Sequence, residues 1–287
     1  MTILVTGATG TVGRFVVRHL LDAGEKVRAV TRRPDVARFP EGVEVVAGDM
    51  TDAARMAEAF EGVTAAHLIN FGDGYRPLGI GQEIADAAVR AGIRRVTILG
   101  GWEEGSLEPA VRASELEWTQ LQPIEFMSNT LNDWAPRLRA EGVIREPYGG
   151  RKSAPVHESD IAAIAAVALA EGGHGGQAYR ISGPEVLTPR DKIRILAEAT
   201  GRDLAFVELT PEQTRREWIE EGTPPDLLLL QVMGDVDART KVEFLLRVYG
   251  GDQEIGRTVT DAVTKVTGRP ALTFAQWATE NAHAFLP

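Results

Sequence analysis

The chain contains no cysteine. Disulfide bonds, thiolate nucleophiles and cysteine-ligated metals are therefore excluded from its fold and its chemistry. Histidines and carboxylates do not recur at metal-ligand spacing either, so the sequence predicts no metal site. Tyrosine is also scarce, with four in the whole chain, which leaves few positions for a phenolic proton donor.

Long apolar runs are absent too. No stretch approaches the roughly 20 residues of a membrane-spanning helix, and the opening MTILVTGATG lacks the features of a signal peptide. The formal net charge of −10 argues against general nucleic-acid binding, because contact with many phosphates needs a basic face. We therefore expect a cytoplasmic monomer or homodimer that acts on a small molecule, with no nucleic-acid or membrane partner.

Short β-branched runs do occur, and in the first half they alternate with helical patterns. Strands are expected at residues 3–6, 26–31, 43–48, 65–71, 95–99, 118–122 and 178–182. Helices are expected between them, at 12–23, 53–60, 80–91, 127–141 and 160–171. Strands separated by helices of this length predict an α/β fold, a Rossmann-type doubly wound parallel sheet.

The second half indicates a smaller, mostly helical C-terminal lobe. Helices are expected there at 188–201, 210–221, 225–249 and 273–285, and two of them begin with threonine followed by proline, a typical helix start. We expect one domain to comprise residues 1–125 plus about 155–183. About 126–154 and 184–287 would then form the smaller lobe, which binds substrate.

A glycine-rich loop follows the first strand. Gly7, Gly10 and Gly13 are spaced G-x-x-G-x-x-G where the strand ends and a helix begins. A pyrophosphate needs close backbone approach and the positive end of a helix dipole, and glycine permits both. Thr9, Thr11 and Val12 belong to the same loop. The alternative is a structural tight turn, but the strand–loop–helix context favours a dinucleotide.

The end of the second strand indicates which dinucleotide. An NAD site usually carries a carboxylate about 20 residues after the loop, whereas this chain has Arg32 and Arg33 there and no acid. Guanidinium groups suit a 2′-phosphate in charge and geometry, and Arg14 could add to them. Unless all three arginines are simply solvated, the cofactor is NADP(H).

Asp49 and Met50 follow the third strand. At this edge a carboxylate can accept a hydrogen bond from an adenine amino group, and Met50 could pack on the ring. A helix N-cap is the alternative role, although Asp52 is the better placed cap.

Together these segments resemble the NmrA-like branch of the atypical short-chain dehydrogenases/reductases, which includes quinone reductases and redox-sensing regulators. The resemblance rests on motifs in order along most of the chain: GATGTVGR at 7–14, TRRP at 31–34, GDMTD at 48–52, AGIRRVTILGG at 91–101, ASELEWTQLQP at 113–123, HESDIAA at 157–163 and TFAQWATENAHAF at 273–285. It implies an NADP-type Rossmann domain with a smaller C-terminal lobe, and a cofactor lying at the carboxyl ends of the strands. The residues it would place against the cofactor are Asn70, Phe71, Gly72, Gly100, Gly101, Pro123 and Phe126.

The chain departs from relatives that reduce carbonyls with a tyrosine and a lysine four residues later. The segment 100–108 contains no tyrosine, lysine or histidine. Tyr148 and Lys152 have the spacing, but Gly149 and Gly150 lie between them and make a helix implausible there. The usual proton donor is therefore missing.

Candidates for polar roles are few. His157 could point into a cleft or could cap a helix, and Glu125 could contact substrate or form a surface salt bridge. Tyr75 belongs to a glycine-rich loop that could close over the cofactor, or it is an exposed aromatic. His67 lies within a strand and is expected to be a core histidine.

Trp102, Phe126, Met127 and Trp134 could line an apolar pocket for a flat substrate, or simply pack in the core. Hydride transfer needs no protein acid, only a nicotinamide held against an electrophile in a dry site. The leading hypothesis is an NADPH-dependent reductase of a quinone or other conjugated or aromatic carbonyl. The alternatives are a catalytically silent NADP(H)-binding redox sensor and a non-redox enzyme that binds a polyketide-like ligand.

Overall fold

The computed structural model describes residues 1–72, 76–100, 104–220, 233, 236–251 and 255–287. The chain forms two compact units. The first comprises Met1–Pro123, Glu158–Ile181 and Asp261–Arg269, and the second comprises Ile124–His157, Ser182–Thr260 and Pro270–Pro287. The sequence pattern gave no sign that Asp261–Arg269 belongs with the first unit.

The first unit is built on a seven-stranded sheet with the order β3-β2-β1-β4-β5-β6-β8, and every neighbouring pair of strands is parallel. Its strands are β1 (Thr2–Val5), β2 (Lys26–Thr31), β3 (Glu44–Ala47), β4 (Ala65–Ile69), β5 (Arg95–Leu99), β6 (Glu117–Pro123) and β8 (Gln177–Ile181). The strand order reverses between β1 and β4, which is where doubly wound sheets bind their ligands. The predicted Rossmann-type fold is confirmed.

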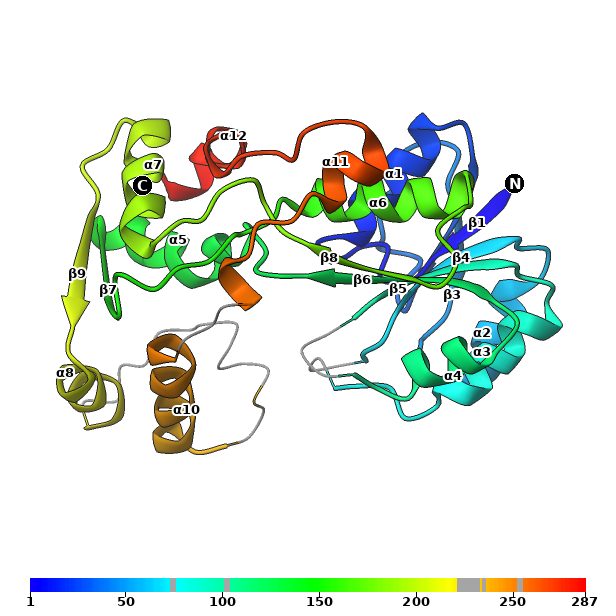
Figure 1. Ribbon diagram of the computed structural model, residues 1–287, viewed down its shortest axis with the longest axis horizontal. Coiled ribbons are helices and arrows are strands. Elements are labelled where there is room, and N and C mark those ends of the chain that lie inside the picture. The colour runs from blue at the N-terminus through cyan, green and yellow to red at the C-terminus, as the bar shows by residue number, and fades with distance from the viewer. Residues whose placement is uncertain (73–75, 101–103, 221–232, 234–235, 252–254) are drawn as a thin grey trace. The chain divides into compact units, whose positions relative to one another are not determined.

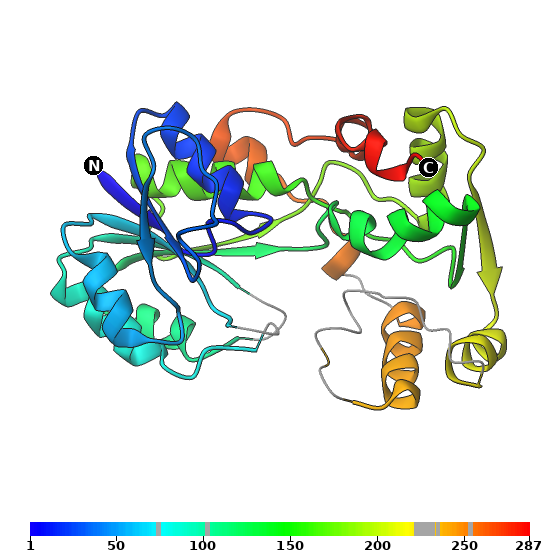
Figure 2. The same cartoon turned by 180° about the vertical axis from the view of Figure 1, so that it is seen from behind.

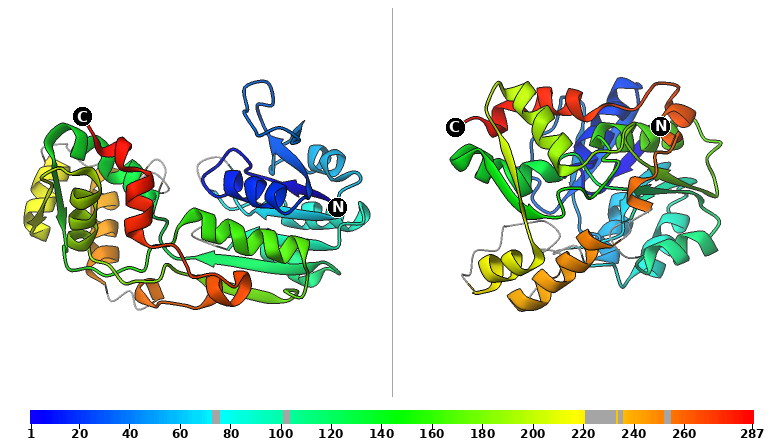
Figure 3. Two further views of the ribbon diagram at one scale, coloured as in Figure 1. Left: turned by 90° about the horizontal axis from the view of Figure 1, so that it is seen from above. Right: turned by 60° about the vertical axis from the view of Figure 1, so that its left-hand side comes forward.

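Helices cover both faces of this sheet (Figures 1 and 2). One face carries α1 (Gly13–Asp22), α6 (Glu158–Ala170) and α11 (Ala262–Thr267), and the other carries α2 (Ala53–Phe60), α3 (Gly81–Arg90) and α4 (Leu107–Ala113). Helix α6 runs alongside α1 (Figure 3). Helix α4 was not predicted, because its seven residues are too few for a clear apolar period.

Burial explains why these segments form these elements. Ile3, Leu4 and Val5 of β1 are completely buried, as expected for a strand with helices on both faces. Helix α6 is apolar around most of its circumference and is buried along most of its length. Gly24 ends α1 with a φ of +76°, a conformation that glycine adopts at little cost.

The second unit is mainly helical. It contains α5 (Asn129–Glu141), β7 (Val143–Pro147), α7 (Pro189–Thr200), β9 (Ala205–Leu209), α8 (Pro211–Arg215), α10 (Ala238–Gly250) and α12 (Phe274–Glu280), with short turns η2 (Arg216–Glu220), η3 (Ile255–Arg257) and η4 (Ala282–Phe285). Strands β7 and β9 form a separate parallel pair that the sequence did not predict. The helix expected at 225–249 begins, within the described residues, at Ala238, where Asp237 caps it.

Two predicted helix starts are confirmed in this unit. Thr188 and Thr210 each form a capping box, and proline occupies the first turn of both helices. A core cluster of this unit is formed mainly by α5, α7 and α12, with Trp277 stacked on Phe274 at a centroid distance of 5.3 Å.

Among the described residues, no helix has both the length and the apolar character needed to cross a bilayer. The same part of the chain holds no cluster of three or more side chains arranged to bind a metal ion.

Candidate functional site

The loop between β1 and α1 brings its three glycines into close backbone contact. Gly7 has a φ of +59°, and the Gly10 N–H donates to the Gly7 carbonyl at 2.8 Å. A Cβ atom at Gly13 would lie only 2.1 Å from that same carbonyl oxygen. Any side chain at Gly13 would therefore force the loop apart, so the tight turn depends on glycine there.

The N-terminus of α1 is open to a ligand. Val12 occupies the N-cap position, and no described side chain caps this end of the helix. Thr9, Thr11 and Arg14 are exposed on the same loop. The Arg14 and Phe15 N–H groups donate to the Gly10 and Val12 carbonyls, and the helix dipole favours an anion at this end.

Thr6 fixes the loop to the neighbouring strand. Its hydroxyl donates to the His67 carbonyl at 2.9 Å and accepts from the Ile69 N–H at 3.0 Å. The glycine loop is therefore held at the point where the strand order reverses, between β1 and β4.

A groove of about 670 Å³ lies beside the end of β2. Its lining includes Arg32 and Asp49 and extends to α2 and the start of α3; the full set is Arg32, Gly48, Asp49, Thr51, Asp52, Ala53, Arg55, Ile80 and Glu83. Arg32 and Arg33 directly follow β2, and both are exposed. The groove thus offers a cation and a carboxylate after β2 and β3, and β2 is the neighbour of β1 in the sheet.

Asp49 is held as a carboxylate. It accepts hydrogen bonds from the Thr51 N–H at 2.8 Å and the Thr51 hydroxyl at 2.7 Å. Burial alone would raise the pKa of Asp49, but these bonds and the charge of Arg32 hold it below its usual value. Asp52, not Asp49, caps α2, as the sequence predicted. Met50 is buried in the core at 5% exposure, and its contact with an adenine ring stays a prediction.

The segment after β4 carries the next candidates. Asn70 is buried, and its side-chain amide donates to the Glu108 carboxylate. Phe71 forms an isolated antiparallel bridge with Pro77, and the Gly72 N–H donates to the Arg76 carbonyl at 2.9 Å. A second groove of about 310 Å³ is lined by Thr51, Gly72, Arg76, Pro77, Leu78, Gly79 and Ile80.

The remaining candidates at the strand ends are distributed over both units. Gly100 follows β5, and Pro123 is the last residue of β6. Phe126 lies in the second unit, where it is bridged to Val156. Gly101, Trp102 and Tyr75 lie outside the described residues.

Met127 and Trp134 are both in the core of the second unit, at 1% and 4% exposure. The Trp134 indole N–H donates to buried Glu146 at 2.9 Å, and Glu146 also accepts from Arg137 and Arg151. The packing accounts for both residues without a ligand, and their role in a substrate pocket stays a prediction.

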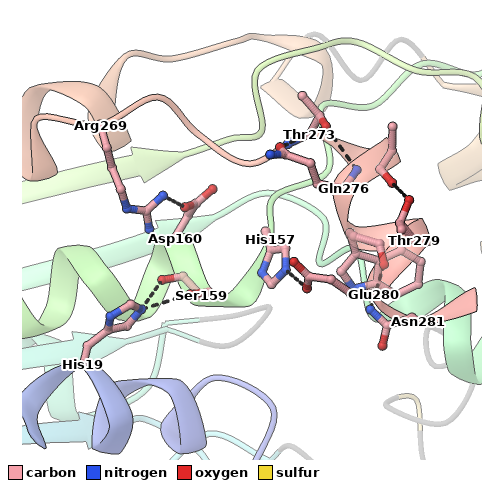
Figure 4. Close-up of polar contacts among 12 residues, drawn as sticks. His19, His157, Ser159, Asp160, Arg269, Thr273, Gln276, Thr279, Glu280 and Asn281 are labelled. Atoms are coloured by element: carbon pink, nitrogen blue, oxygen red, sulfur yellow. Dashed lines mark hydrogen bonds and ion pairs between the residues drawn. The ribbon is translucent and has the colours of Figure 1, made fainter. Parts of the chain in front are cut away.

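His157 is buried at 2% exposure and directs its Nε2 toward Glu280 of α12 at 3.1 Å (Figure 4). The same view shows two contacts of the first unit, between His19 and Ser159 and between Asp160 and Arg269. The pairing with Glu280 gives His157 a structural role, and a catalytic role for it stays a prediction.

Glu125 forms a salt bridge with Lys192 of α7, with 2.6 Å between Oε1 and Nζ. Lys192 is 5% exposed. Burial alone would raise the pKa of Glu125, but the charge and hydrogen bond of Lys192 and a bond from Ser153 hold it below its usual value. Glu125 is therefore a carboxylate that can accept hydrogen bonds but cannot readily donate a proton.

Tyr148 and Lys152 lie in the segment after β7, outside any helix. Tyr148 has a φ of +57°, unusual for a residue with a side chain. The pair therefore lacks the helical placement that would bring a tyrosine and a lysine to one face.

Two side chains of the site region were missed by the sequence interpretation. Glu108 is a buried acid in a short helix, and Lys192 is a buried base in an amphipathic one. For Lys192 the sequence signal was a charged residue on the apolar side of a helical pattern, which is weak without knowledge of its partner, and for Glu108 the helix itself was not predicted.

Comparison with known proteins agrees with this geometry. The NmrA-like family model matches residues 1–99. A (4-alkanoyl-5-oxo-2,5-dihydrofuran-3-yl)methyl phosphate reductase of Streptomyces griseus is 38% identical over 299 residues, covering 99% of both chains. The chain belongs to the NmrA-like family. An NAD(P)H azoreductase of Xenophilus azovorans is 32% identical over 305 residues, again covering 99% of both chains.

Solved structures with the same fold include other NmrA-like proteins. The NADPH-dependent quinone oxidoreductase QOR2 of Escherichia coli in complex with NADPH aligns with a TM-score of 0.75, at 23% identity over 97% of this chain and 99% of that one. The negative transcriptional regulator Nmra in complex with NADP aligns with a TM-score of 0.70, at 18% identity over 97% of this chain and 94% of that one. At these identities the likeness shows the fold alone.

Proposed function

We propose that this chain is an NADPH-dependent reductase whose substrates are small conjugated carbonyl compounds. The observation that carries the proposal is the glycine loop at the β1–β4 reversal, together with the Arg32 and Asp49 groove after the neighbouring strands β2 and β3. This combination offers a pyrophosphate cradle and a cation for a 2′-phosphate in one unit.

The residues present fit the cofactor. The space that a Cβ at Gly13 would fill is already taken by the Gly7 carbonyl, so the start of α1 packs closely on the loop, as in dinucleotide-binding turns. Arg32 and Arg33 would hold the 2′-phosphate, and Asp49 would accept from the adenine amino group. Asn70, Gly100 and Pro123 follow or end the central strands and would face the other nucleotide half.

The relatives of higher identity support a reductase. The Streptomyces griseus relative is named for a ring with a carbon–carbon double bond next to a 5-oxo group and a 4-alkanoyl group. That double bond is polarised by conjugation and accepts a hydride at carbon. The azoreductase is named for azo compounds, and both proteins are named as reductases. An electrophilic conjugated double bond is therefore the substrate feature we propose.

NADPH, when bound, supplies a hydride. The chain supplies binding and orientation of the cofactor and the substrate. A proton must follow to complete reduction of a conjugated carbonyl. Since no described tyrosine has a lysine placed beside it in a helix, water is the proposed proton source.

A catalytically silent redox sensor is the second candidate. The named regulator Nmra shares the fold at 18% identity, whereas the reductases reach 38% and 32%. The difference in identity favours the enzyme.

A substrate panel tests the proposal. Oxidation of NADPH is followed with a benzoquinone, a 4-alkanoyl butenolide phosphate and an azo dye, with NADH run in parallel. We expect turnover of at least one compound, with NADPH preferred over NADH. Stoichiometric NADPH binding with no oxidation across the panel would overturn the reductase and leave the sensor.

A further inference from the structure

Glu108 is a carboxylate enclosed in the first unit. It lies in the first turn of α4 and is 1% exposed. Its Oε1 accepts from the side-chain amide of Asn70, and its Oε2 accepts from the Gly105 N–H at 3.1 Å. Burying a carboxylate costs free energy unless its oxygens accept hydrogen bonds. The two hydrogen bonds therefore hold the Glu108 side chain in a defined arrangement.

These contacts join the ends of two neighbouring strands. Asn70 is the first residue after β4, and Gly105 lies between β5 and α4. A Cβ at Gly100, the first residue after β5, would lie 3.9 Å from the Glu108 carboxylate. One side chain therefore reaches the carboxyl ends of both strands.

Backbone hydrogen bonds extend the connection. The Leu78 N–H donates to the Asn70 carbonyl at 2.8 Å, and the Ser106 N–H donates to the Leu78 carbonyl at 3.0 Å. The Ser106 hydroxyl accepts from the Gly81 N–H at 2.8 Å. Described residues that follow β4 and β5 are thus joined by backbone hydrogen bonds and by the side chains of Ser106 and Glu108.

Gly81 and Gly105 pack closely against their neighbours. A Cβ at Gly81 would lie 2.2 Å from the Ser106 carbonyl carbon, and one at Gly105 would lie 3.2 Å from Pro77. If the Glu108 carboxylate is lost, the Asn70 amide and the Gly105 N–H stay buried without their acceptor. A buried donor without an acceptor is unfavourable, so both groups would tend to move from their positions.

The strand order indicates which half of the cofactor would lie near Asn70 and Glu108. The groove with Arg32 and Asp49 follows β2 and β3, on one side of the reversal between β1 and β4. Strands β4 and β5 lie on the other side, and a dinucleotide bound across the reversal has its second nucleotide there. With the adenosine half at Arg32, that second nucleotide is the nicotinamide half.

We propose that Glu108 is a positioning residue for the nicotinamide half of the cofactor. It acts through Asn70 and Gly105, whose hydrogen bonds it accepts, and it does not itself touch the ring. The inference rests on the proposed function for the identity of the cofactor. It adds that nicotinamide placement depends on a buried acid that carries no role in holding the adenosine half.

Fragment binding separates this role from general structural support. The dissociation constants of NADPH and of adenosine 2′,5′-bisphosphate, which lacks the nicotinamide half, are measured by calorimetry for Glu108→Gln. A glutamine presents one acceptor and one donor where two acceptors are needed. We expect about a 10-fold weaker NADPH binding, because Asn70 is no longer held in place for the nicotinamide half, and bisphosphate binding within about twofold of wild type.

Glu104→Gln is the matched control. Glu104 lies four residues away, carries the same carboxylate and pairs with Arg112 at the surface. Loss of an exposed ion pair has little effect, so both ligands should bind this variant as they bind the wild type.

The double variant Asn70→Asp, Glu108→Gln tests whether restoring the hydrogen bonds restores NADPH binding. The glutamine amide would donate to the new aspartate, and its carbonyl would accept from the Gly105 N–H. Net charge is unchanged, and NADPH affinity should return to within a few-fold of wild type.

Equal loss of NADPH and bisphosphate binding in Glu108→Gln, or no loss of either, overturns the positioning role. So does a double variant that binds NADPH no better than Glu108→Gln. Wild-type protein that binds NADPH but reduces nothing overturns the reductase instead, while the binding comparison still tests Glu108.

Discussion

Arg32 is the residue on which the choice of cofactor depends most directly. The positive charge of Arg32 helps to lower the pKa of the Asp49 carboxyl. Arg32 also lines the groove after β2 and β3. A guanidinium at this place can pair with a 2′-phosphate, which NADH lacks.

Arg32→Ala should weaken NADPH binding by about 10- to 100-fold and leave NADH binding nearly unchanged, because only the phosphate contact is lost. Titration of both cofactors by calorimetry checks this. Arg38→Ala is the control, since Arg38 donates only to the nearby carbonyls of Asp35 and Ala37 in the described contacts. An unchanged NADPH preference in Arg32→Ala contradicts the assignment.

Burial of His67 makes the stability of the folded chain depend on pH. Its Nδ1 lies 2.8 Å from the Thr97 hydroxyl, and among the described residues its Nε2 has no hydrogen-bond partner. Burial lowers the pKa of His67 from 6.5 to about 4. The unfolded chain therefore takes up a proton that the folded chain resists, and stability is full above pH 6.5 and falls as the pH drops toward 4.

The double variant His67→Leu, Thr97→Val removes the ring together with its hydroxyl partner. The loss of unfolding free energy between pH 6.5 and pH 4.5 should shrink by on the order of 2 kcal/mol relative to wild type. Urea unfolding at the two pH values measures it. His19, whose pKa is also lowered by burial, titrates in both proteins and cancels in the comparison. Identical pH dependence in the two proteins would show that His67 is not held neutral.

The sequence identifies a candidate site residue when the residue type and its position in the chain are enough, without knowledge of the residues that it contacts. Glycines at a turn and arginines after a strand can be recognised from order and spacing alone. Glu108 and Lys192 could not be recognised, because their meaning depends on Asn70 and Glu125, which lie 38 and 67 residues away. His67 was expected to be a core histidine, and it is completely buried.

At the scale of elements, the loop from β1 to α1 determines whether the first unit can hold a pyrophosphate. The loop is closed by the contact between Gly10 and Gly7, and Gly13 packs directly on the Gly7 carbonyl. Strand, turn and helix are therefore fitted together through backbone atoms, with no side chain between them.

Gly13→Ala should disrupt this fit, since the new methyl group would lie 2.1 Å from the Gly7 carbonyl oxygen. We expect a loss of stability of about 1–3 kcal/mol, as for overpacked cores, and loss of NADPH binding at least as large as in Arg32→Ala. Urea unfolding and NADPH titration give the two values. Gly150→Ala is the control, because a Cβ there meets no atom within 4 Å. Wild-type affinity in Gly13→Ala would show that the loop does not hold the cofactor.

Elements with their own periodicity were predicted well. The parallel strands of the first unit are short apolar runs between helices, and two later helices begin with a threonine followed by a proline. Strands β7 and β9 were missed because they pair only with each other, far apart in sequence. Charged Arg145 and Glu146 also interrupt the apolar pattern of β7, although Glu146 is fully buried among its partners.

At the scale of the whole molecule, the chain combines a unit that holds the cofactor loop with a mainly helical second unit. The predicted fold and NmrA-like family are confirmed. Family membership does not by itself decide between catalysis and sensing, since the fold is shared with a named reductase and with a named regulator. That distinction depends on whether a hydride leaves the bound cofactor.

Deuterium transfer tests this most directly. The protein is mixed in single turnover with NADPH deuterated at either of the two C4 positions of the nicotinamide, and with a 4-alkanoyl butenolide phosphate as acceptor. This acceptor is chosen because a carbon-bound deuterium does not exchange with water during isolation. The account predicts deuterium in the reduced product from one of the two labelled cofactors and not from the other. NADPH that stays bound and reduced, or a product without deuterium from either label, would contradict it.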